Sequence, residues 1–157
     1  MIHRIRHLLL FLAVFWVGVS GALAAEEPEP VILTATAEGK NMNEVMLALH
    51  GAVVGHNYSF VRQQAIDSRL VPYGQEVRSV RLFYFCNMAS MDRALRLDPR
   101  AAQMIPYRVT LVETPTGVDM MAVNPAWIAQ GLGNPVLQAD AVELKRDYLS
   151  ILDEATL

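Results

Sequence analysis

The residues best suited to chemistry in this chain surround its only cysteine. Cys86, Met88 and Met91 form a C-x-M-x-x-M pattern that combines one thiol with two thioethers. Soft sulfur ligands suit cuprous copper, so one interpretation is a copper- or haem-handling protein. The other is packing, because methionine fills irregular gaps in small cores and the chain holds eight methionines. We favour packing, which leaves copper or haem as the alternative cofactor.

Cys86 itself allows two further interpretations. It ends an apolar run in which it shares a parity with Leu82 and Tyr84, and this pattern favours burial as a small hydrophobe. A reactive thiol, as in a thiol enzyme or a sulfur carrier, needs a nearby cation or a helix N-terminus to stabilise its thiolate. A helix is expected just after Asn87, and Arg108 is expected on a neighbouring strand, so both elements are available.

A second candidate site is a concentration of arginine. Between residues 77 and 108 the chain carries six arginines and two acids, although its overall net charge is −3. Such an excess of positive charge can bind an anion or an acidic partner. The alternative is a solvated face on which arginine stems cover apolar surface. The residues predicted to bind a ligand are Arg93, Arg96, Arg100, Arg108, Cys86 and Asn87.

Several strands and helices must position these residues. Runs of β-branched, aromatic and alternating residues predict strands at 31–37, 58–66, 77–86, 107–113 and 118–124. Helical periodicity and capping residues predict helices at 42–55 and 88–97, helix starts at Asn124-Pro125 and Asn134-Pro135, and a long final helix. The run Thr114-Pro115-Thr116-Gly117 indicates a hairpin. This order favours an antiparallel sheet with helices on one face.

The strand predicted at 77–86 is apolar on both faces near its end. Leu82 and Tyr84 alternate with Phe83 and Phe85, a pattern typical of a strand that is covered on both sides. Helices can cover one face. Because exposed apolar surface marks an interface, we expect a second copy of the chain to cover the other. The sequence therefore predicts a homodimer formed through the sheet.

Composition narrows the class of protein. Residues 1–24 hold two of the 13 basic residues and none of the 16 acidic ones, so the remaining chain has a net charge of −5. A generic nucleic-acid binder would be basic. With one cysteine, no internal disulfide and no dithiol cycle can form. His50 and His56 lack the spacing of a helical metal pair and are interpreted as surface or boundary residues.

The N-terminal residues predict export. Residues 1–7 are cationic, residues 8–23 are almost wholly apolar, and Ala22-Leu23-Ala24 supplies the small residues of a cleavage site. The apolar run is too short to span a bilayer comfortably. We expect a signal peptide at residues 1–24, a flexible leader at 25–30 and one globular α+β domain at 31–155. The mature protein is then periplasmic, with no membrane association after cleavage.

A set of short motifs resembles a known family. The motifs are Phe85-Cys86-Asn87, Leu97-Asp98-Pro99-Arg100, Pro106-x-Arg108-Val109, Val112-Glu113, Gly117-Val118 and Asn124-Pro125. Their order and spacing are similar to those of the domain of unknown function 302 family. The resemblance implies a two-layer β-α-β(4)-α sandwich of the TATA-binding-protein-like class, often a homodimer, with no settled activity. Many such relatives have a cysteine where this chain has Tyr107, so two-cysteine chemistry is not expected here.

These patterns favour an exported, non-catalytic binding or accessory protein. General acid–base catalysis would need a histidine or paired carboxylates in a cleft, and nucleophilic catalysis would need a base beside Cys86. The residue spacing indicates neither arrangement. The predicted partner is a small anion or a periplasmic protein, recognised by the arginine-rich segment. A copper- or haem-handling protein is the second interpretation, and a thiol enzyme or sulfur carrier is the third.

Overall fold

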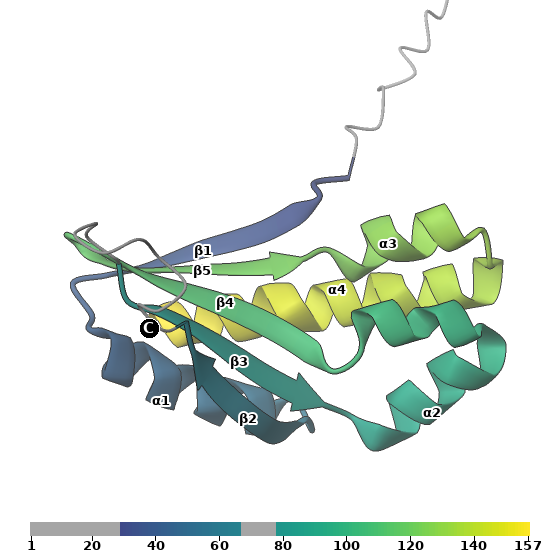
Figure 1. Ribbon diagram of the computed structural model, residues 1–157, viewed down its shortest axis with the longest axis horizontal. Helices are drawn as coiled ribbons and strands as arrows, with labels where there is room; N and C mark the ends of the chain where they lie inside the picture. Colours follow the sequence, from purple (N-terminus) through teal and green to yellow (C-terminus); the bar gives the residue numbers. More distant parts are fainter. Residues whose placement is uncertain (1–28, 67–77) are drawn as a thin grey trace, which may run out of the picture.

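A five-stranded antiparallel sheet, with helices packed against one face, forms the framework of the protein (Figure 1). The computed structural model describes residues 29–66 and 78–157. The predicted signal peptide and residues 25–28 of the predicted leader lie outside the described residues, as does Val77 at the start of a predicted strand. Among the described helices, none is long and apolar enough to cross a membrane.

The strands lie close to their predicted positions. They are β1 (Ile32–Glu38), β2 (Ser59–Ala65), β3 (Val80–Cys86), β4 (Tyr107–Thr114) and β5 (Gly117–Val123). Their order across the sheet is β1-β5-β4-β3-β2, and each neighbouring pair is antiparallel. The predicted hairpin joins β4 to β5, and β3 lies inside the sheet between β4 and β2. This architecture confirms the predicted α+β fold.

The helices begin at capping residues that the sequence pattern predicts. They are α1 (Met42–Gly55), α2 (Met88–Leu97), the 3-10 helix η2 (Pro99–Met104), α3 (Pro125–Leu132) and α4 (Pro135–Thr156). Asn41 and Glu44 form a complete capping box on α1. Asn87, Asn124 and Asn134 each accept hydrogen bonds from backbone N–H groups of the helix that follows. Only η2 is not predicted by the sequence pattern.

The main core lies between the sheet and the pair α1 and α4. Alternate residues of β3 and β4 face these helices, and Phe83, Phe85 and Leu111 are almost fully buried. They share one cluster with Leu49, Val53, Ile151 and Leu152. Fully burying a side chain of this size contributes about 1.5–3 kcal/mol. Because apolar residues recur at period 2 in the strands and at helical spacing in α1 and α4, this packing follows from the sequence pattern.

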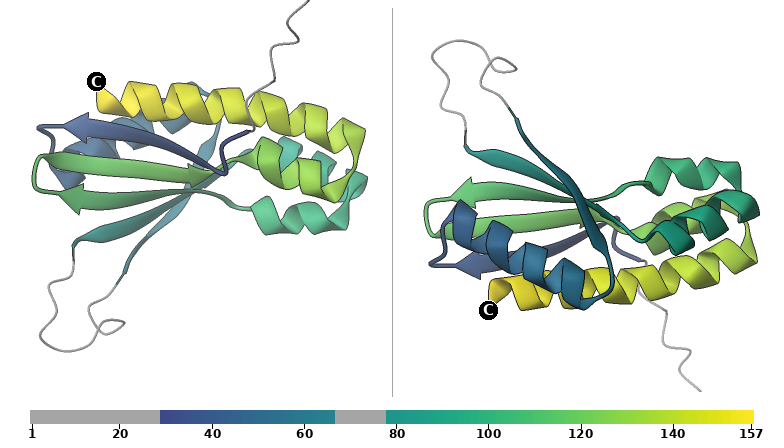
Figure 2. Two further views of the ribbon diagram at one scale, coloured as in Figure 1. Left: turned by 90° about the horizontal axis from the view of Figure 1, so that it is seen from above. Right: turned by 90° about the horizontal axis from the view of Figure 1, so that it is seen from below.

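Helix α4 runs beyond the sheet, and α2, η2 and α3 pack around its N-terminal half (Figure 2). A second, smaller core forms there from alanines and one leucine: Ala94, Ala101, Ala129, Leu137 and Ala141. Small side chains let the helices approach closely but leave space where larger polar residues meet. Both cavities described below lie at this helical end of the sheet.

The other face of the sheet carries no helix in the described part of the chain (Figure 2). Leu82, Tyr84, Val112 and Met121 are half-buried on this open face. The prediction that β3 is covered on both sides is therefore met on one side only within this chain.

Glu29 and Pro30, at the end of the predicted leader, accept hydrogen bonds from Asn124 Nδ2 at 3.1 and 2.7 Å.

Candidate functional site

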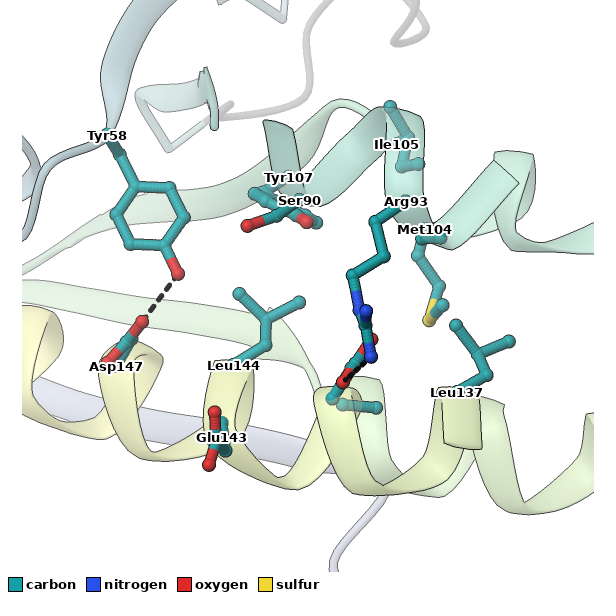
Figure 3. A pocket seen from close by; sticks show the side chains of 13 residues that line it. Tyr58, Ser90, Arg93, Met104, Ile105, Tyr107, Leu137, Glu143, Leu144 and Asp147 are labelled. Atoms are coloured by element: carbon teal, nitrogen blue, oxygen red, sulfur yellow. Dashed lines mark hydrogen bonds and ion pairs between the residues drawn. The ribbon is translucent and has the colours of Figure 1, made fainter. Parts of the chain in front are cut away.

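The candidate functional site is a cavity of about 240 Å³ between α2 and α4, which we call the α2–α4 cavity (Figure 3). The start of β4 and the residue before β2 complete its wall. The lining residues are Tyr58, Ser90, Arg93, Ala94, Met104, Ile105, Tyr107, Leu137, Asp140, Ala141, Glu143, Leu144 and Asp147. Typical pockets for drug-sized ligands measure about 300–1,000 Å³, so this one suits a small ligand.

Helix periodicity places most of the lining. Asp140, Glu143 and Asp147 are three and four residues apart on α4, so their side chains share the helix face that looks onto α2. Asn87 begins α2, and its side chain accepts a hydrogen bond from the Ser90 N–H at 3.0 Å. Arg93 follows one turn later and crosses to α4.

Two pairs of side chains bridge the walls of the cavity. Arg93 Nε donates to Asp140 Oδ2 at 2.6 Å, and Arg93 Nη2 donates to Oδ1 of the same carboxylate at 3.3 Å. This hydrogen bonding raises the pKa of Arg93. The Tyr58 hydroxyl donates to Asp147 Oδ2 at 2.5 Å. Burial and this hydrogen bond raise the pKa of Tyr58 well above its ordinary value.

Tyr107 presents its hydroxyl to the cavity. The residue is only 4% exposed, and its hydroxyl, which has no hydrogen-bond partner among the residues that the structure describes, is not one of the fully buried atoms. The rings of Tyr58, Phe85 and Tyr148 surround it, with centroids 5.7–6.3 Å away. Burial, followed by the charges of Cys86, Asp140 and Asp147, raises the pKa of Tyr107 to about 12.

The protonated Tyr107 phenol can therefore both donate and accept a hydrogen bond at neutral pH. Among the described residues, the fully buried side-chain oxygen without a partner is Thr114 Oγ1, so the Tyr107 hydroxyl keeps access to the open space of the cavity. A ligand or water in the cavity would supply the missing partner.

A second cavity, of about 260 Å³, lies on the other side of the segment from Met104 to Tyr107. Its lining includes Arg108, Gln103 and Tyr84, together with apolar residues of β5 and α3. The lining contains no acid, and none of the described ion pairs involves Arg108. We call this the Arg108 cavity.

The four arginines predicted to bind a ligand do not line one site. Arg93 lines the α2–α4 cavity and Arg108 the other, whereas Arg96 and Arg100 line neither. Arg96 Nε donates to Asp92 at 2.8 Å, one helical turn away. Arg93, Arg96 and Arg100 are each bound to a carboxylate of the protein itself.

Arg100 is held by the chain at two points. Its Nη2 donates to Asp98 Oδ2 at 2.7 Å and to the Leu132 carbonyl at 2.8 Å. Together with its backbone N–H, which also donates to Asp98, the residue fixes η2 against α3. The guanidinium thus has a structural role.

The fold brings together some of the sulfur atoms of the C-x-M-x-x-M pattern. Cys86 is 6% exposed, and its Sγ lies 3.9 Å from Met88 Sδ. Met88 is 70% exposed, whereas Met91 packs against the main core. Two of the three sulfur atoms of the alternative copper site therefore lie together. Within the described residues, no group of three or more His, Cys, Asp or Glu side chains could hold a metal ion.

Asn87 uses both ends of its amide for structure. Its oxygen caps α2, and its Nδ2 donates to the Asn57 carbonyl at 3.1 Å. The residue thus ties the start of α2 to the turn before β2, which also positions Tyr58. We assign Asn87 a positioning role in the site and not a direct contact.

Sequence reasoning missed the residues that make the polar wall. Tyr58, Tyr107 and Asp147 come from three separate regions of the chain, and no local motif connects them. The acids of α4 recur at helical spacing, which is a signal, but such spacing is also typical of a solvated helix face.

The fold and the cavities define a small two-layer α+β protein with hollows at the helical end of its sheet. Residues 33–155 match the family model described as Domain of unknown function DUF302, so the chain belongs to this family. A similar solved structure is the crystal structure of an uncharacterized conserved protein DUF302 from Bacillus stearothermophilus. The two chains are 15% identical with a TM-score of 0.72, over 80% of this chain and 98% of the other. That likeness shows the shared fold. No curated protein matches the chain.

Proposed function

We propose that this protein is an exported, non-catalytic binding module that holds a small ligand in the α2–α4 cavity. The observation that carries the proposal is the Tyr107 hydroxyl, which belongs to a residue only 4% exposed, faces the cavity and has no hydrogen-bond partner among the described residues. Arg93 and Asp147 are held in place by hydrogen bonds to neighbouring elements, so the polar wall is preorganised.

Binding fits the side-chain contacts better than catalysis does. The thiol of Cys86 contacts the Met88 sulfur, and within the described residues no base is hydrogen-bonded to it. A thiol enzyme or sulfur carrier requires an activated thiolate. The proposal therefore places the function in the cavity and not at the thiol.

The proposed address is the periplasm, supported by the cationic, apolar and small-residue order of residues 1–24. The mass of the exported protein should correspond to a chain that begins near Ala25. A mass that includes residues 1–24 would support an uncleaved membrane anchor.

We expect fragments that bind to change the backbone amide signals of cavity residues in ¹⁵N NMR spectra. The panel consists of small fragments with cationic, neutral and anionic head groups. Ser90→Phe should abolish these changes, because Ser90 lines the mouth of the cavity. Ala89→Phe is the matched control, since Ala89 is the exposed neighbour on α2 and does not line the cavity. Binding that survives Ser90→Phe, or no binding by any fragment, would contradict the proposal.

If the ligand is an anion, we propose that it binds in the Arg108 cavity. Arg108 is the one predicted arginine that lines a cavity and has no carboxylate partner among the described residues. Sulfate or acetate should then change the backbone amide signals of Gln103 and Arg108, but not those of the α4 residues near the Tyr107 hydroxyl. That result would place an anion in the Arg108 cavity instead of the α2–α4 cavity.

Cuprous copper handling is the second candidate function. The favouring observation is the 3.9 Å separation of Cys86 Sγ and Met88 Sδ, which would let both sulfurs ligate one soft ion. The exposed side chain of Met88 would give access from solvent.

A further inference from the structure

We propose that the ligand of the α2–α4 cavity is a small organic ammonium ion with a short apolar tail. This inference rests on the proposed function and specifies the chemical class of its ligand. It differs from the anion that the arginine-rich sequence suggests, because the charges that line this cavity are mainly negative.

The balance of charge favours a cation. Three acids, Asp140, Glu143 and Asp147, line the cavity together with a single basic residue, Arg93. Arg93 is bound in bidentate fashion by Asp140, so the charges of Glu143 and Asp147 remain. Neither of these two has a cationic partner among the described ion pairs.

The other basic residues of α4 do not compensate these charges inside the cavity. Lys145 is directed to Glu29, with which it forms an ion pair of 2.5 Å, and neither Lys145 nor Arg146 lines the cavity. A ligand with a positive head group would therefore neutralise the remaining negative charge of the cavity.

Hydrogen-bond acceptors face the same space. Tyr58 donates to Oδ2 of Asp147, and the other carboxylate oxygen receives no hydrogen bond from the described residues. The Tyr107 hydroxyl retains its lone pairs, and burial together with nearby carboxylates raises its pKa to about 12, so it stays neutral. An ammonium group has three N–H donors and no acceptor, which matches a site rich in acceptors.

The remaining wall accommodates an apolar tail. Met104, Ile105, Leu137 and Leu144 line the cavity beside the polar groups (Figure 3). The volume of about 240 Å³ limits the tail to a short alkyl chain or a single ring. The tail lies in an apolar pocket, while charge and acceptors select the head group.

The test compares three probes of equal chain length in NMR titrations of the full chain: butylammonium, butanol and butyrate. Butylammonium should bind at the cavity at least about tenfold more tightly than either other probe, as expected for a charge-assisted hydrogen bond. Asp147→Asn removes the charge but keeps an acceptor for Tyr58, and it should weaken butylammonium by about tenfold. Asp153→Asn is the matched control, because Asp153 is exposed on α4 and does not line the cavity.

Tyr107→Phe provides a second variant, since it removes only the hydroxyl. It should weaken butylammonium several-fold at an unchanged melting temperature, and it carries the test if Asp147→Asn does not fold. Butanol or butyrate binding in this cavity as tightly as butylammonium would overturn the ammonium inference and leave the proposed function standing. Failure of every probe, including the wider fragment panel, would overturn both.

Discussion

Cys86 and Met88 bring two sulfur atoms within 3.9 Å, but their exposures differ greatly, at 6% and 70%. At the scale of single residues, Cys86 is buried, as expected of a packing residue, whereas Met88 is exposed, as expected of an accessible metal ligand. A buried thiol reacts slowly unless a cation or base stabilises its thiolate. Tyr107 differs, because its hydroxyl has no hydrogen-bond partner among the described residues and lines the cavity.

Cys86→Ala should lower the free energy of unfolding by about 1 kcal/mol, because a small buried side chain loses its packing contacts. Cys86→Ser should cost more, since a hydroxyl is then buried in an apolar place. Iodoacetamide should label the native protein slowly. Chemical denaturation and mass spectrometry measure the two effects. Rapid labelling at pH 6 would instead support a reactive thiol.

Cuprous titration against a competing chelator decides the second candidate function. If copper is bound, Cys86→Ala and Met88→Ala should each lower the affinity by orders of magnitude. Met91→Leu is the control, because Met91 packs against the core and should leave the affinity unchanged. We expect no stable copper binding by the wild type, and tight binding that depends on both sulfurs would contradict that expectation.

At the scale of the elements, α4 connects the core to the site. Its 22 residues span about 33 Å, enough to cover the sheet with one half and to pack against α2 and α3 with the other. Tyr148 and Ile151 belong to the main core, and Asp140 and Asp147 line the cavity. One rigid helix thus holds the polar wall in a fixed position relative to the sheet.

The junction between α2 and η2 depends on Asp98, which is buried and accepts hydrogen bonds from the backbone and side chain of Arg100. These bonds hold the pKa of Asp98 below its usual value. Because the folded-state pKa is lower than that of the unfolded chain, near 3.9, the stabilisation is fully present above that pH. It is lost as pH falls through the folded-state value.

Asp98→Asn should therefore lower the free energy of unfolding at pH 7 and flatten its decline below about pH 4. Urea unfolding at a series of pH values measures both effects. Asp92→Asn is the comparison, because Asp92 forms an exposed pair with Arg96 that contributes little to stability. Equal effects of the two substitutions at pH 7 would argue against a role for Asp98 at this junction.

At the scale of the whole molecule, the sheet has one covered face and one open face. Leu82, Tyr84, Val112 and Met121 are the apolar residues at the centre of the open face, where the strand register places Thr110, Arg108 and Asp119 beside them. Exposed apolar surface of this kind marks interfaces. We propose that a second copy of the chain covers this face, which is the homodimer expected from the sequence of β3.

Light scattering at micromolar concentration should show a dimer that Val112→Lys converts to a folded monomer. The charge would have to be buried in the interface, which is costly. Leu47→Lys is the control, because Leu47 is 76% exposed on α1, on the helical side of the sheet. A wild-type monomer at physiological salt, or a dimer disrupted equally by both substitutions, would contradict dimerisation through the open face.

The sequence by itself determined the elements and the fold class. Strand alternation around Phe83 and Phe85, the capping box of Asn41 and Glu44, and the proline-led start at Asn134 are local signals. Each depends on side chains within a few residues of one another, so the observed elements lie close to their predicted ranges. The buried state of Cys86 also followed from its place at the end of an apolar strand.

Only the tertiary structure decided the candidate site. The sequence pattern left Arg93 available to bind an anion. In the fold, Asp140 of α4, 47 residues further along the chain, lies beside Arg93 and binds it. In the same way Tyr58 and Asp147 are 89 residues apart in the sequence but share a hydrogen bond. Charge partners and cavity walls depend on distances between elements, and local spacing carries no information about those distances. The sequence therefore predicted where charges concentrate, and the packing of α2 against α4 determined which charges remain available to a ligand.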